Sequence, residues 1–522
     1  MSKPCGFSAG VFRLHRYSLE GVSDSPRSSA VAITRISLLL SGWAVAVVLG
    51  WRVWEKGADQ PLAQPVTAPV TAPVTAPVTA PVTVPVTVPV PEGRAEDLFR
   101  RWAAGPQHDG ALLGFCLLDE NGATLFASPL AGTALCPASS LKTLTTGAAF
   151  GLLGPEFRFT TTLAGTAPLR ASGVLEGDLV LVGGGDPTLS LADLAQLAEA
   201  AVASGLKRVT GRVRSDASIF PQDPMSDHWN WGDIGNAYGA GAFGLNLEHN
   251  RLVITFEPGA QPGAPAKFLG GGPVPRDTRW ENHVLTGPAG SGDGVTIYSQ
   301  PFGRTATLRG TVPAGESGFT VSGANPDPPA VAAEQLRARL EAAGVKFADR
   351  PGPFPSTART TLATHQSAPL PEIIDHLHRV SDNLEAQCLF LTLGQRASAD
   401  PATAVRQYWE KSGVRFTGLR LLDGSGLARA NMICPLDLAR VAFAARRGPH
   451  GQRFYESLTA SSDGAVRGKV GGMSGVKTQV GYLHTASGRD LTFCLMANGL
   501  PMDRGFWTQI EELLESIRTA EL

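Results

Sequence analysis

The sequence predicts an α+β fold in which one domain is interrupted by inserted, mostly β modules. Short apolar runs typical of strands lie near both ends of the chain, at residues 112–118 and 491–497, and a helical pattern follows each of them. Between these ends, over about residues 157–363, glycine and proline are dense, and strand-like pieces alternate with turns. We therefore expect residues 95–156 and 364–522 to form one domain around inserted modules at 157–363.

The outer domain begins with a predicted hairpin and helix. The apolar runs 112–118 and 123–127 are joined by "DENG", a good turn sequence. The stretch "CPASSLKTLTTGAAFGLLG" (136–154) then has apolar residues at helical spacing, and Gly154-Pro155 ends it. The last predicted helix has its apolar face at Ile510, Leu513, Leu514 and Ile517.

Composition excludes several classes of protein. A chain of 522 residues is too long for one compact unit, and 43% hydrophobic with 17% charged residues describes a globular protein. A formal net charge of -1 argues against a nucleic-acid partner. The six cysteines form neither a C-x-x-C pair nor a cluster with histidine at metal-binding spacing. We expect buried single thiols and no structural metal.

An apolar segment near the N-terminus predicts a membrane anchor. Residues 36–51, "ISLLLSGWAVAVVLGW", are apolar, and with the next three residues they approach the ~20 needed to span a bilayer. Arginines precede the segment, so residues 1–35 should stay in the cytoplasm and the rest of the chain should lie outside it. A cleaved signal peptide is the alternative, but no clear cleavage site follows. We expect 36–54 to be an uncleaved signal anchor.

Residues 55–94 are predicted to be a linker. A four-residue repeat, "PVTAPVTAPVTA…", fills residues 65–90 and places proline at every fourth position, which prevents helix and sheet ladders. Such a segment is an extended, semi-rigid spacer that reaches about 80 Å at ~3.1 Å per residue. The globular part is therefore expected to work at a distance from the membrane.

The first candidate for chemistry is Ser139 with Lys142. Residues three apart share a helix face, so the serine and the lysine should lie side by side. A lysine against so apolar a helix is costly unless it has a function. The alternative is a serine N-cap with a lysine that reaches solvent.

Two further motifs follow in order. Ser381-Asp382-Asn383 lies at a joint between two predicted helices, where a simple N-cap is the alternative. Lys469-Val470-Gly471 lies on a late predicted strand, where the alternative is a glycine-rich hairpin with a solvated lysine. The ordered set S-x-x-K, S-x-N and K-x-G is typical of active-site serine penicillin-binding proteins and β-lactamases.

The residue types suit acyl transfer through a serine. Ser139 would attack a carbonyl carbon, and Lys142, deprotonated in its crowded cationic surroundings, would take the serine proton. Ser381 would relay a proton to the leaving amine.

The remaining motif residues suit substrate binding. Asn383 would hold the substrate amide, and Lys469 would attract a carboxylate, with Val470 and Gly471 beside it. Backbone N–H groups of Ser139 and of the strand after the third motif would stabilise the oxyanion.

The separation of the first two motifs, from residue 139 to residue 381, is far larger than β-lactamases allow. From about residue 98 to 522 the chain resembles the D-alanyl-D-alanine carboxypeptidase/endopeptidases of the penicillin-binding protein 4 type, peptidase family S13. The segments that carry the resemblance are "PASSLK", "GDLVLVGGGDPTL", "VTGRVRSDASIF", "YGAGAFGLNLEHN", "SDNLEAQ", "DGSGLARAN" and "GYLHTASGRDLTFCLMANG".

The resemblance implies a β-lactamase/transpeptidase-like catalytic domain, an antiparallel sheet with helices on both sides. It implies hydrolysis of D-Ala–D-Ala termini and of D-Ala–diaminopimelate cross-links in peptidoglycan stem peptides, through an acyl-enzyme on Ser139. β-Lactams would act as covalent inhibitors, and no cofactor is expected. With the predicted anchor, the protein would lie in the inner membrane with its catalytic part in the periplasm, or be periplasmic if the signal is cleaved.

The chain departs from the family pattern at two positions. The usual Lys-Thr-Gly is Lys469-Val470-Gly471, which lacks a hydroxyl expected to bind the substrate carboxylate. Moving the motif to residues 477–479, "KTQ", fails because Gly471 and the downstream "GY" fit the first frame. In addition, Gln387 replaces the usual glutamate after "SDNLxA".

Two other functions compete with the peptidase. Val470 leaves open a non-catalytic or weakly active penicillin-binding wall scaffold, although the other motif residues are intact. A β-lactamase or esterase on the same fold is disfavoured by the long insertion. Covalent labelling by penicillin separates the scaffold from the enzymes, and fast release of the label would indicate a β-lactamase.

Overall fold

The computed structural model describes residues 93–350, 359–501 and 505–520. The predicted anchor at 36–54 and the predicted linker up to residue 92 lie outside the described residues. Within the described ranges, no helix combines the length and the apolar character that a membrane span requires.

The outer part of the described chain is built on a six-stranded antiparallel sheet. Strand β1 pairs with β19, so that Cys116 lies opposite Cys494 and segments from near both ends of the described chain meet in one sheet. The strands, in sheet order, are β16 (Thr459–Ala460), β17 (Val466–Met473), β18 (Val476–His484), β19 (Asp490–Asn498), β1 (Leu112–Leu118) and β2 (Thr124–Ala127).

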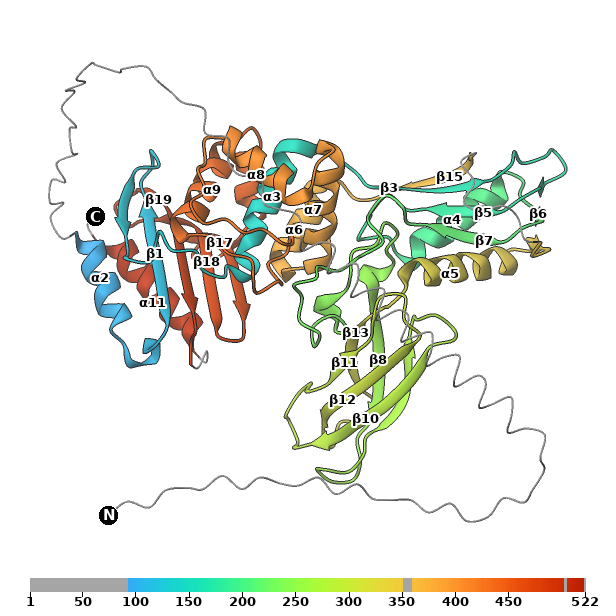
Figure 1. Ribbon diagram of the computed structural model, residues 1–522, viewed down its shortest axis with the longest axis horizontal. Coiled ribbons are helices and arrows are strands. Elements are labelled where there is room, and N and C mark those ends of the chain that lie inside the picture. Colours follow the sequence, from blue (N-terminus) through green and yellow to red (C-terminus); the bar gives the residue numbers. More distant parts are fainter. Residues whose placement is uncertain (1–92, 351–358, 502–504, 521–522) are drawn as a thin grey trace, which may run out of the picture. The chain divides into compact units, whose positions relative to one another are not determined.

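Helices cover both faces of this sheet because its strands bury alternate residues on opposite sides. Phe115 and Leu117 of β1 pack with α2 (Arg94–Ala103) and α11 (Phe506–Thr519). Cys116 and Leu118 belong to the larger core on the other face. Helices of that core are α3 (Lys142–Leu153), α6 (Leu370–Val380), α7 (Asn383–Ala397), α8 (Pro401–Lys411), α9 (Pro435–Arg447) and α10 (Gly451–Ser457). Figure 1 shows α2 and α11 on one side of the sheet and α3, α6, α7, α8 and α9 on the other. The predicted α+β arrangement is confirmed.

The inserted region contains a mixed part with two helices, α4 (Leu191–Ala203) and α5 (Pro328–Ala342), which share one apolar core with two small sheets. The sequence pattern of this region did not indicate these helices. The first sheet runs β15 (Thr360–Gln366), β3 (Thr160–Gly165), β5 (Leu179–Val182), β7 (Val213–Asp216), and the second runs β14 (Lys346–Phe347), β6 (Arg208–Val209), β4 (Val174–Leu175).

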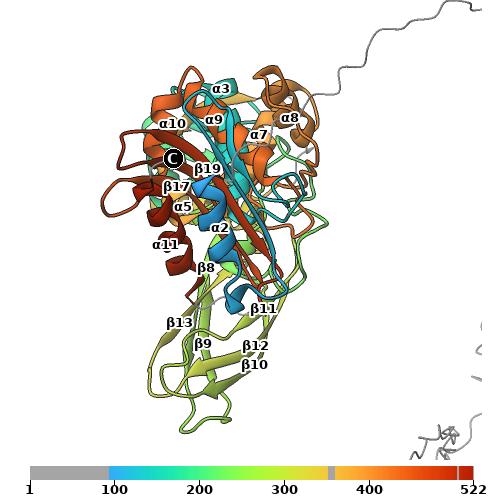
Figure 2. The same cartoon turned by 90° about the vertical axis from the view of Figure 1, so that its left-hand side faces the viewer.

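A second inserted part is a pair of three-stranded sheets around a separate core that includes Ile254, Val284 and Leu308. One sheet runs β13 (Phe319–Ala324), β8 (Arg251–Glu257), β9 (Lys267–Gly272), and the other runs β10 (Arg279–Gly287), β12 (Thr305–Pro313), β11 (Thr296–Tyr298). Figure 2 shows these strands, β8 to β13, from a second side. The domain limits drawn from the sequence stay predictions, and the limit at residue 363 falls within β15.

Candidate active site

Ser139 lies in a 3₁₀ turn, η2 (Ala138–Leu141), that leads into α3, so the α-helix begins at Lys142 and not at the serine as the sequence pattern predicted. The residue before the serine, Ala138, has φ 45°, a left-handed conformation that a non-glycine residue adopts only when its surroundings impose it. Gly426 packs against this turn, and a Cβ there would lie 1.9 Å from the Ala138 carbonyl oxygen. The turn is therefore held in place by close backbone packing.

The Lys142 amine makes three contacts. Its Nζ lies 2.8 Å from Ser139 Oγ, 2.6 Å from Asn383 Oδ1 and 2.7 Å from the carbonyl oxygen of Ser425. The amide and carbonyl oxygens can only accept hydrogen bonds, whereas the serine hydroxyl can also donate. A neutral amine has two N–H groups and one lone pair, so it matches this set when the lone pair faces the Ser139 hydroxyl. This is the arrangement of a general base with its nucleophile.

The electrostatic surroundings favour the neutral amine. Burial lowers the pKa of the Lys142 side chain well below its ordinary value, and the nearby Lys469 ammonium lowers it further. Burial also lowers the pKa of Lys469, to about 8. These shifts favour the neutral amine on Lys142, whereas Lys469, with a pKa of about 8, keeps its charge at neutral pH.

The S-x-N motif forms the joint between α6 and α7. Ser381 ends α6 with φ 59°, and Asp382 caps α7 by accepting a hydrogen bond from the Glu385 N–H at 2.9 Å. The N-cap alternative thus holds for Asp382. Asn383 faces the nucleophile, with its Oδ1 on Lys142 and its Nδ2 donating to the Tyr238 carbonyl oxygen at 2.8 Å.

Ser381 is not joined to the nucleophile by a direct contact. Within residues 93–350, 359–501 and 505–520, its side chain makes no hydrogen bond with Ser139, Lys142 or Lys469. Its role as a proton relay therefore stays a prediction.

The third motif lies within β17, where buried and exposed residues alternate from Lys469 to Gly472. Lys469 is buried and donates to the Val470 carbonyl oxygen at 2.7 Å, while Val470 is 44% exposed. A Cβ on Gly471 would lie 2.7 Å from the backbone nitrogen of Ser139. Only glycine lets the strand approach the turn that carries Ser139 this closely. This agrees with placing the K-x-G motif at residues 469–471.

The alternative frame at residues 477–479 lies on the neighbouring strand, β18. The Lys477 ammonium lies 5.5 Å from the centre of the Trp507 ring. The Thr478 hydroxyl is buried and donates to the Pro137 carbonyl oxygen at 2.6 Å. That hydroxyl is engaged with the turn that carries Ser139, so it cannot replace the hydroxyl of the threonine that is missing at position 470.

Sequence reasoning missed Asp423, a fully buried carboxylate beneath the site. It accepts hydrogen bonds from three backbone N–H groups of its own loop at 2.6–2.8 Å and from the Trp229 indole at 2.8 Å. This fixes the loop whose Ser425 carbonyl oxygen accepts from Lys142. The segment "DGSGLARAN" contributed to the resemblance, but nothing in the sequence indicated that its aspartate orients the loop.

A cavity of about 380 Å³ opens above the nucleophile. Ser139, Asn383 and Gly472 line it, which brings the first two motifs and the strand after the third into one space. The cavity also carries charges of both signs, the carboxylate of Asp233 from the inserted region and the guanidinium of Arg429. A peptide with free amine and carboxylate groups suits such a lining.

Comparison with known proteins identifies the family of the chain. The family model of D-Ala-D-Ala carboxypeptidase 3 (S13) matches residues 96–517. The chain belongs to this family. The match covers most of the chain, including all three motifs and the inserted region between them.

Relatives of this S13 chain include the D-alanyl-D-alanine carboxypeptidase of Actinomadura sp. (strain R39), 29% identical over 429 residues, 76% of this chain and 79% of that protein. The D-alanyl-D-alanine carboxypeptidase DacB of Haemophilus influenzae is 25% identical over 414 residues, 75% of this chain and 86% of that protein. The crystal structure of penicillin binding protein 4 (dacB) from Haemophilus influenzae superposes with a TM-score of 0.68 at 21% identity, covering 81% of this chain and 98% of that one. This last similarity shows the fold.

The two departures from the S13 pattern have different structural settings. Gln387 is buried, and its Oε1 accepts a hydrogen bond from the Gly424 N–H at 2.8 Å. An amide therefore still supplies an acceptor to the loop that follows Asp423. Val470, in contrast, is exposed and faces the same side of β17 as Gly472, which lines the cavity, so its contact with the substrate carboxylate stays a prediction.

We expect Val470→Thr to raise kcat/KM on a peptide ending in D-Ala–D-Ala by about tenfold or somewhat more. The two side chains are nearly isosteric and both favour strands. A hydrogen bond from the new hydroxyl to a carboxylate contributes roughly 1.5–3 kcal/mol, or about 10–150-fold. An ester substrate without that carboxylate should gain far less. Equal responses of the two substrates would show that position 470 does not contact the carboxylate.

Proposed function

We propose that this S13 protein is a serine-type D-Ala–D-Ala carboxypeptidase of peptidoglycan that also cleaves D-Ala cross-links as an endopeptidase. The observation that carries the proposal is the Lys142 amine, which has two fixed acceptors for its N–H groups and leaves its lone pair to the Ser139 hydroxyl. This geometry supports a serine nucleophile that is activated without a histidine.

In the first half-reaction, Ser139 Oγ attacks the carbonyl carbon of the penultimate D-Ala, and its proton passes to Lys142 Nζ. The carbonyl oxygen becomes an oxyanion, which the backbone N–H groups of Ser139 and of the Gly472 segment stabilise. The C–N bond then breaks, the leaving amine takes the proton held by Lys142, and D-Ala departs. Water then attacks the ester left on Ser139 and gives a proton to Lys142, which returns it to Ser139 Oγ as the ester bond breaks, so the free serine is restored.

The cavity charges support endopeptidase action in addition. In a D-Ala–diaminopimelate cross-link the amine at the scissile bond is acylated, while the carboxylate on the same carbon stays free. The diaminopimelate of the donor stem keeps both a free amine and a free carboxylate at the end of its side chain. Asp233 and Arg429 place a carboxylate and a guanidinium in the same cavity as Ser139. We infer that the former receives the amine and that cationic groups, Lys469 included, receive carboxylates.

Inhibition and location complete the proposal. The penicillin binding protein 4 of Haemophilus influenzae has a crystal structure complexed with a β-lactam. We propose that β-lactams acylate Ser139 here, because their ring carbonyl would occupy the position of the D-Ala carbonyl. We further propose that residues 36–54 anchor the chain in the inner membrane and that the catalytic part acts in the periplasm.

Mass spectrometry of muropeptides tests the reaction directly. Purified full-chain protein should convert pentapeptide stems to tetrapeptides, with release of one D-Ala, and should split cross-linked dimers into monomers. Loss of D-Ala without loss of dimers would restrict the enzyme to carboxypeptidase action. Penicillin labelling with neither product would favour the wall scaffold instead.

A further inference from the structure

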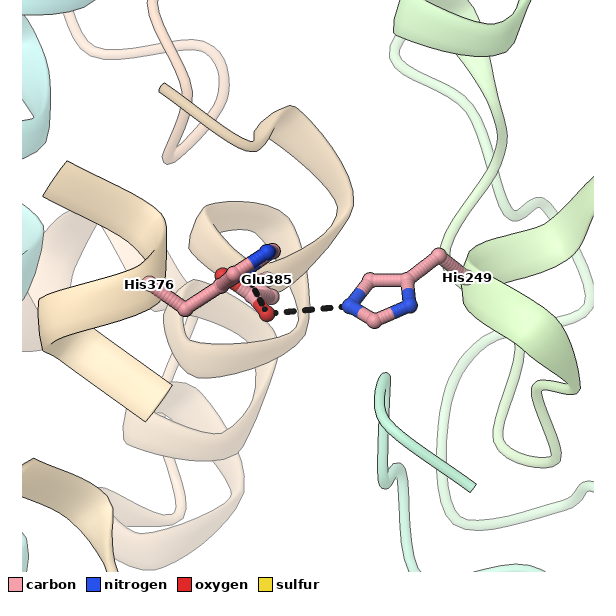
Figure 3. A group of neighbouring side chains, drawn as sticks. All are labelled: His249, His376 and Glu385. Carbon is pink, nitrogen blue, oxygen red and sulfur yellow. Dashed lines mark hydrogen bonds and ion pairs between the residues drawn. The ribbon is translucent and has the colours of Figure 1, made fainter. Parts of the chain in front are cut away.

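Two histidines and a glutamate converge behind the S-x-N joint (Figure 3). His249 comes from the 3₁₀ turn η4 (Glu248–Asn250) of the inserted region, His376 from α6, and Glu385 from α7. Glu385 Oε1 lies 3.0 Å from His249 Nε2 and 2.8 Å from His376 Nδ1. All three ligand-type atoms lie within 4.8 Å of one another.

Hydrogen bonding does not use the full capacity of the glutamate. The Glu385 side chain is almost completely buried, and a single oxygen, Oε1, accepts from both histidines. Its second oxygen, Oε2, is buried without a hydrogen-bond partner. Leaving such an atom unsatisfied costs about 1–3 kcal/mol or more for a charged group, so an unpartnered buried carboxylate oxygen calls for an explanation.

The spacing suits a small divalent cation. Zn²⁺ binds histidine nitrogen and carboxylate oxygen at about 2.0–2.2 Å in tetrahedral geometry, which sets neighbouring ligand atoms about 3.3 Å apart. The two N–O distances would therefore lengthen by less than about 0.6 Å. The imidazoles of His249 and His376 are 26% and 34% exposed, so they have room for this adjustment.

The turn that carries His249 is held in an uncommon backbone conformation. Glu248, His249 and Asn250 have φ values of 53°, 52° and 52°, three consecutive non-glycine residues in the left-handed region. Glu248 accepts from the Leu191 N–H at 2.6 Å, and Asn250 donates to the Gly241 carbonyl oxygen at 2.8 Å. These bonds fix the turn so that the imidazole between them points at Glu385 (Figure 3).

Access from solvent is available on the His249 side. His249 lines a cavity of about 420 Å³ together with Ser381 and Asn383. A hydrated ion can therefore reach the cluster, and a water molecule can occupy the coordination position that three protein ligands leave open.

We propose that His249, His376 and Glu385 bind one divalent first-row transition-metal ion, with Zn²⁺ the best match to two imidazoles and a carboxylate. The bound ion would fasten the inserted region to α6 and α7, the helices that flank the S-x-N joint. It would thereby stabilise the position of Asn383, two residues from Glu385. This replaces the expectation from sequence that the chain has no metal site, and it does not depend on the peptidase reaction.

Metal titration of the full chain tests the proposal. Protein purified in detergent and stripped with a chelator should take up one Zn²⁺ per chain in competition with a chromophoric chelator, and Zn²⁺ should raise its melting temperature. His249→Gln is the sharpest variant, because glutamine can still donate to Glu385 but is a poor metal ligand. It should weaken Zn²⁺ binding by at least about 100-fold, since outer-sphere partners alone account for about 10–100-fold.

Two comparisons complete the experiment. His376→Gln should weaken binding as His249→Gln does, and both variants should keep the circular dichroism of the wild type. His484→Gln changes an exposed histidine paired with Asp490 at 2.7 Å and should bind Zn²⁺ like the wild type. If the wild type takes up no Zn²⁺ at micromolar concentration, or both cluster variants bind it unchanged, the cluster is an ion-paired contact and the proposal is wrong.

Discussion

Ser139→Ala is expected to abolish covalent labelling by a fluorescent penicillin and to lower peptidase activity by about 10⁴-fold or more. Ser139 supplies the hydroxyl that lies 2.8 Å from the Lys142 amine. Alanine is compatible with the 3₁₀ turn and the helix after it, so the folded protein should persist. Gel fluorescence after penicillin treatment and the melting temperature measure the two outcomes.

The neighbouring Ser140 provides a matched control. Its hydroxyl is fully buried, donates to the Pro137 carbonyl oxygen at 2.7 Å and lies 3.1 Å from the Thr478 hydroxyl. Ser140→Ala should therefore keep penicillin labelling while lowering stability by about 1 kcal/mol. Labelling that persists in Ser139→Ala and disappears in Ser140→Ala would exchange the roles assigned to the two serines.

Local patterns in the sequence predicted the parts of the site that depend on neighbouring residues. The i, i+3 spacing brings Ser139 beside Lys142 even though the first turn is 3₁₀, because that turn also places such residues on one side. Asp382 acts as the helix cap that the joint between two helical patterns indicated. The apolar runs at 112–118 and 491–497 correspond to β1 and β19, which pair with each other in the six-stranded sheet.

Contacts between distant segments could not be predicted from one sequence. The Asp423 carboxylate orients a loop from below, and Tyr238 offers a backbone carbonyl to Asn383, which no side-chain pattern indicates. The histidine and glutamate cluster is spread over residues 249, 376 and 385, so it lacks the short spacing by which metal motifs are recognised. The helices α4 and α5 lie in a region whose glycine and proline content concealed their helical periodicity.

Lys142→Arg is expected to lower the rate of Ser139 acylation by about 10²–10⁴-fold. The guanidinium keeps its proton at any pH at which the protein is folded, so it offers no lone pair to the serine hydroxyl. Lys142→Met, which removes both the charge and the lone pair, should lose a similar amount. Stopped-flow acylation with a chromogenic β-lactam measures the rate, and Lys411→Met at the end of α8 serves as the control.

The pH dependence of kcat/KM in the wild type tests the same role of Lys142 without a substitution. Because burial and Lys469 depress the pKa of Lys142, its lone pair is available at lower pH than that of an ordinary lysine, and kcat/KM should fall as acid protonates it. Above about pH 8 Lys469 loses its charge, so kcat/KM on a carboxylate peptide should fall again, whereas a neutral ester should keep its rate. Lys142→Arg should remove this fall of kcat/KM at acid pH, together with most of the activity. If Lys142→Arg kept a near wild-type kcat/KM with the same fall at acid pH, another group would have to accept the serine proton.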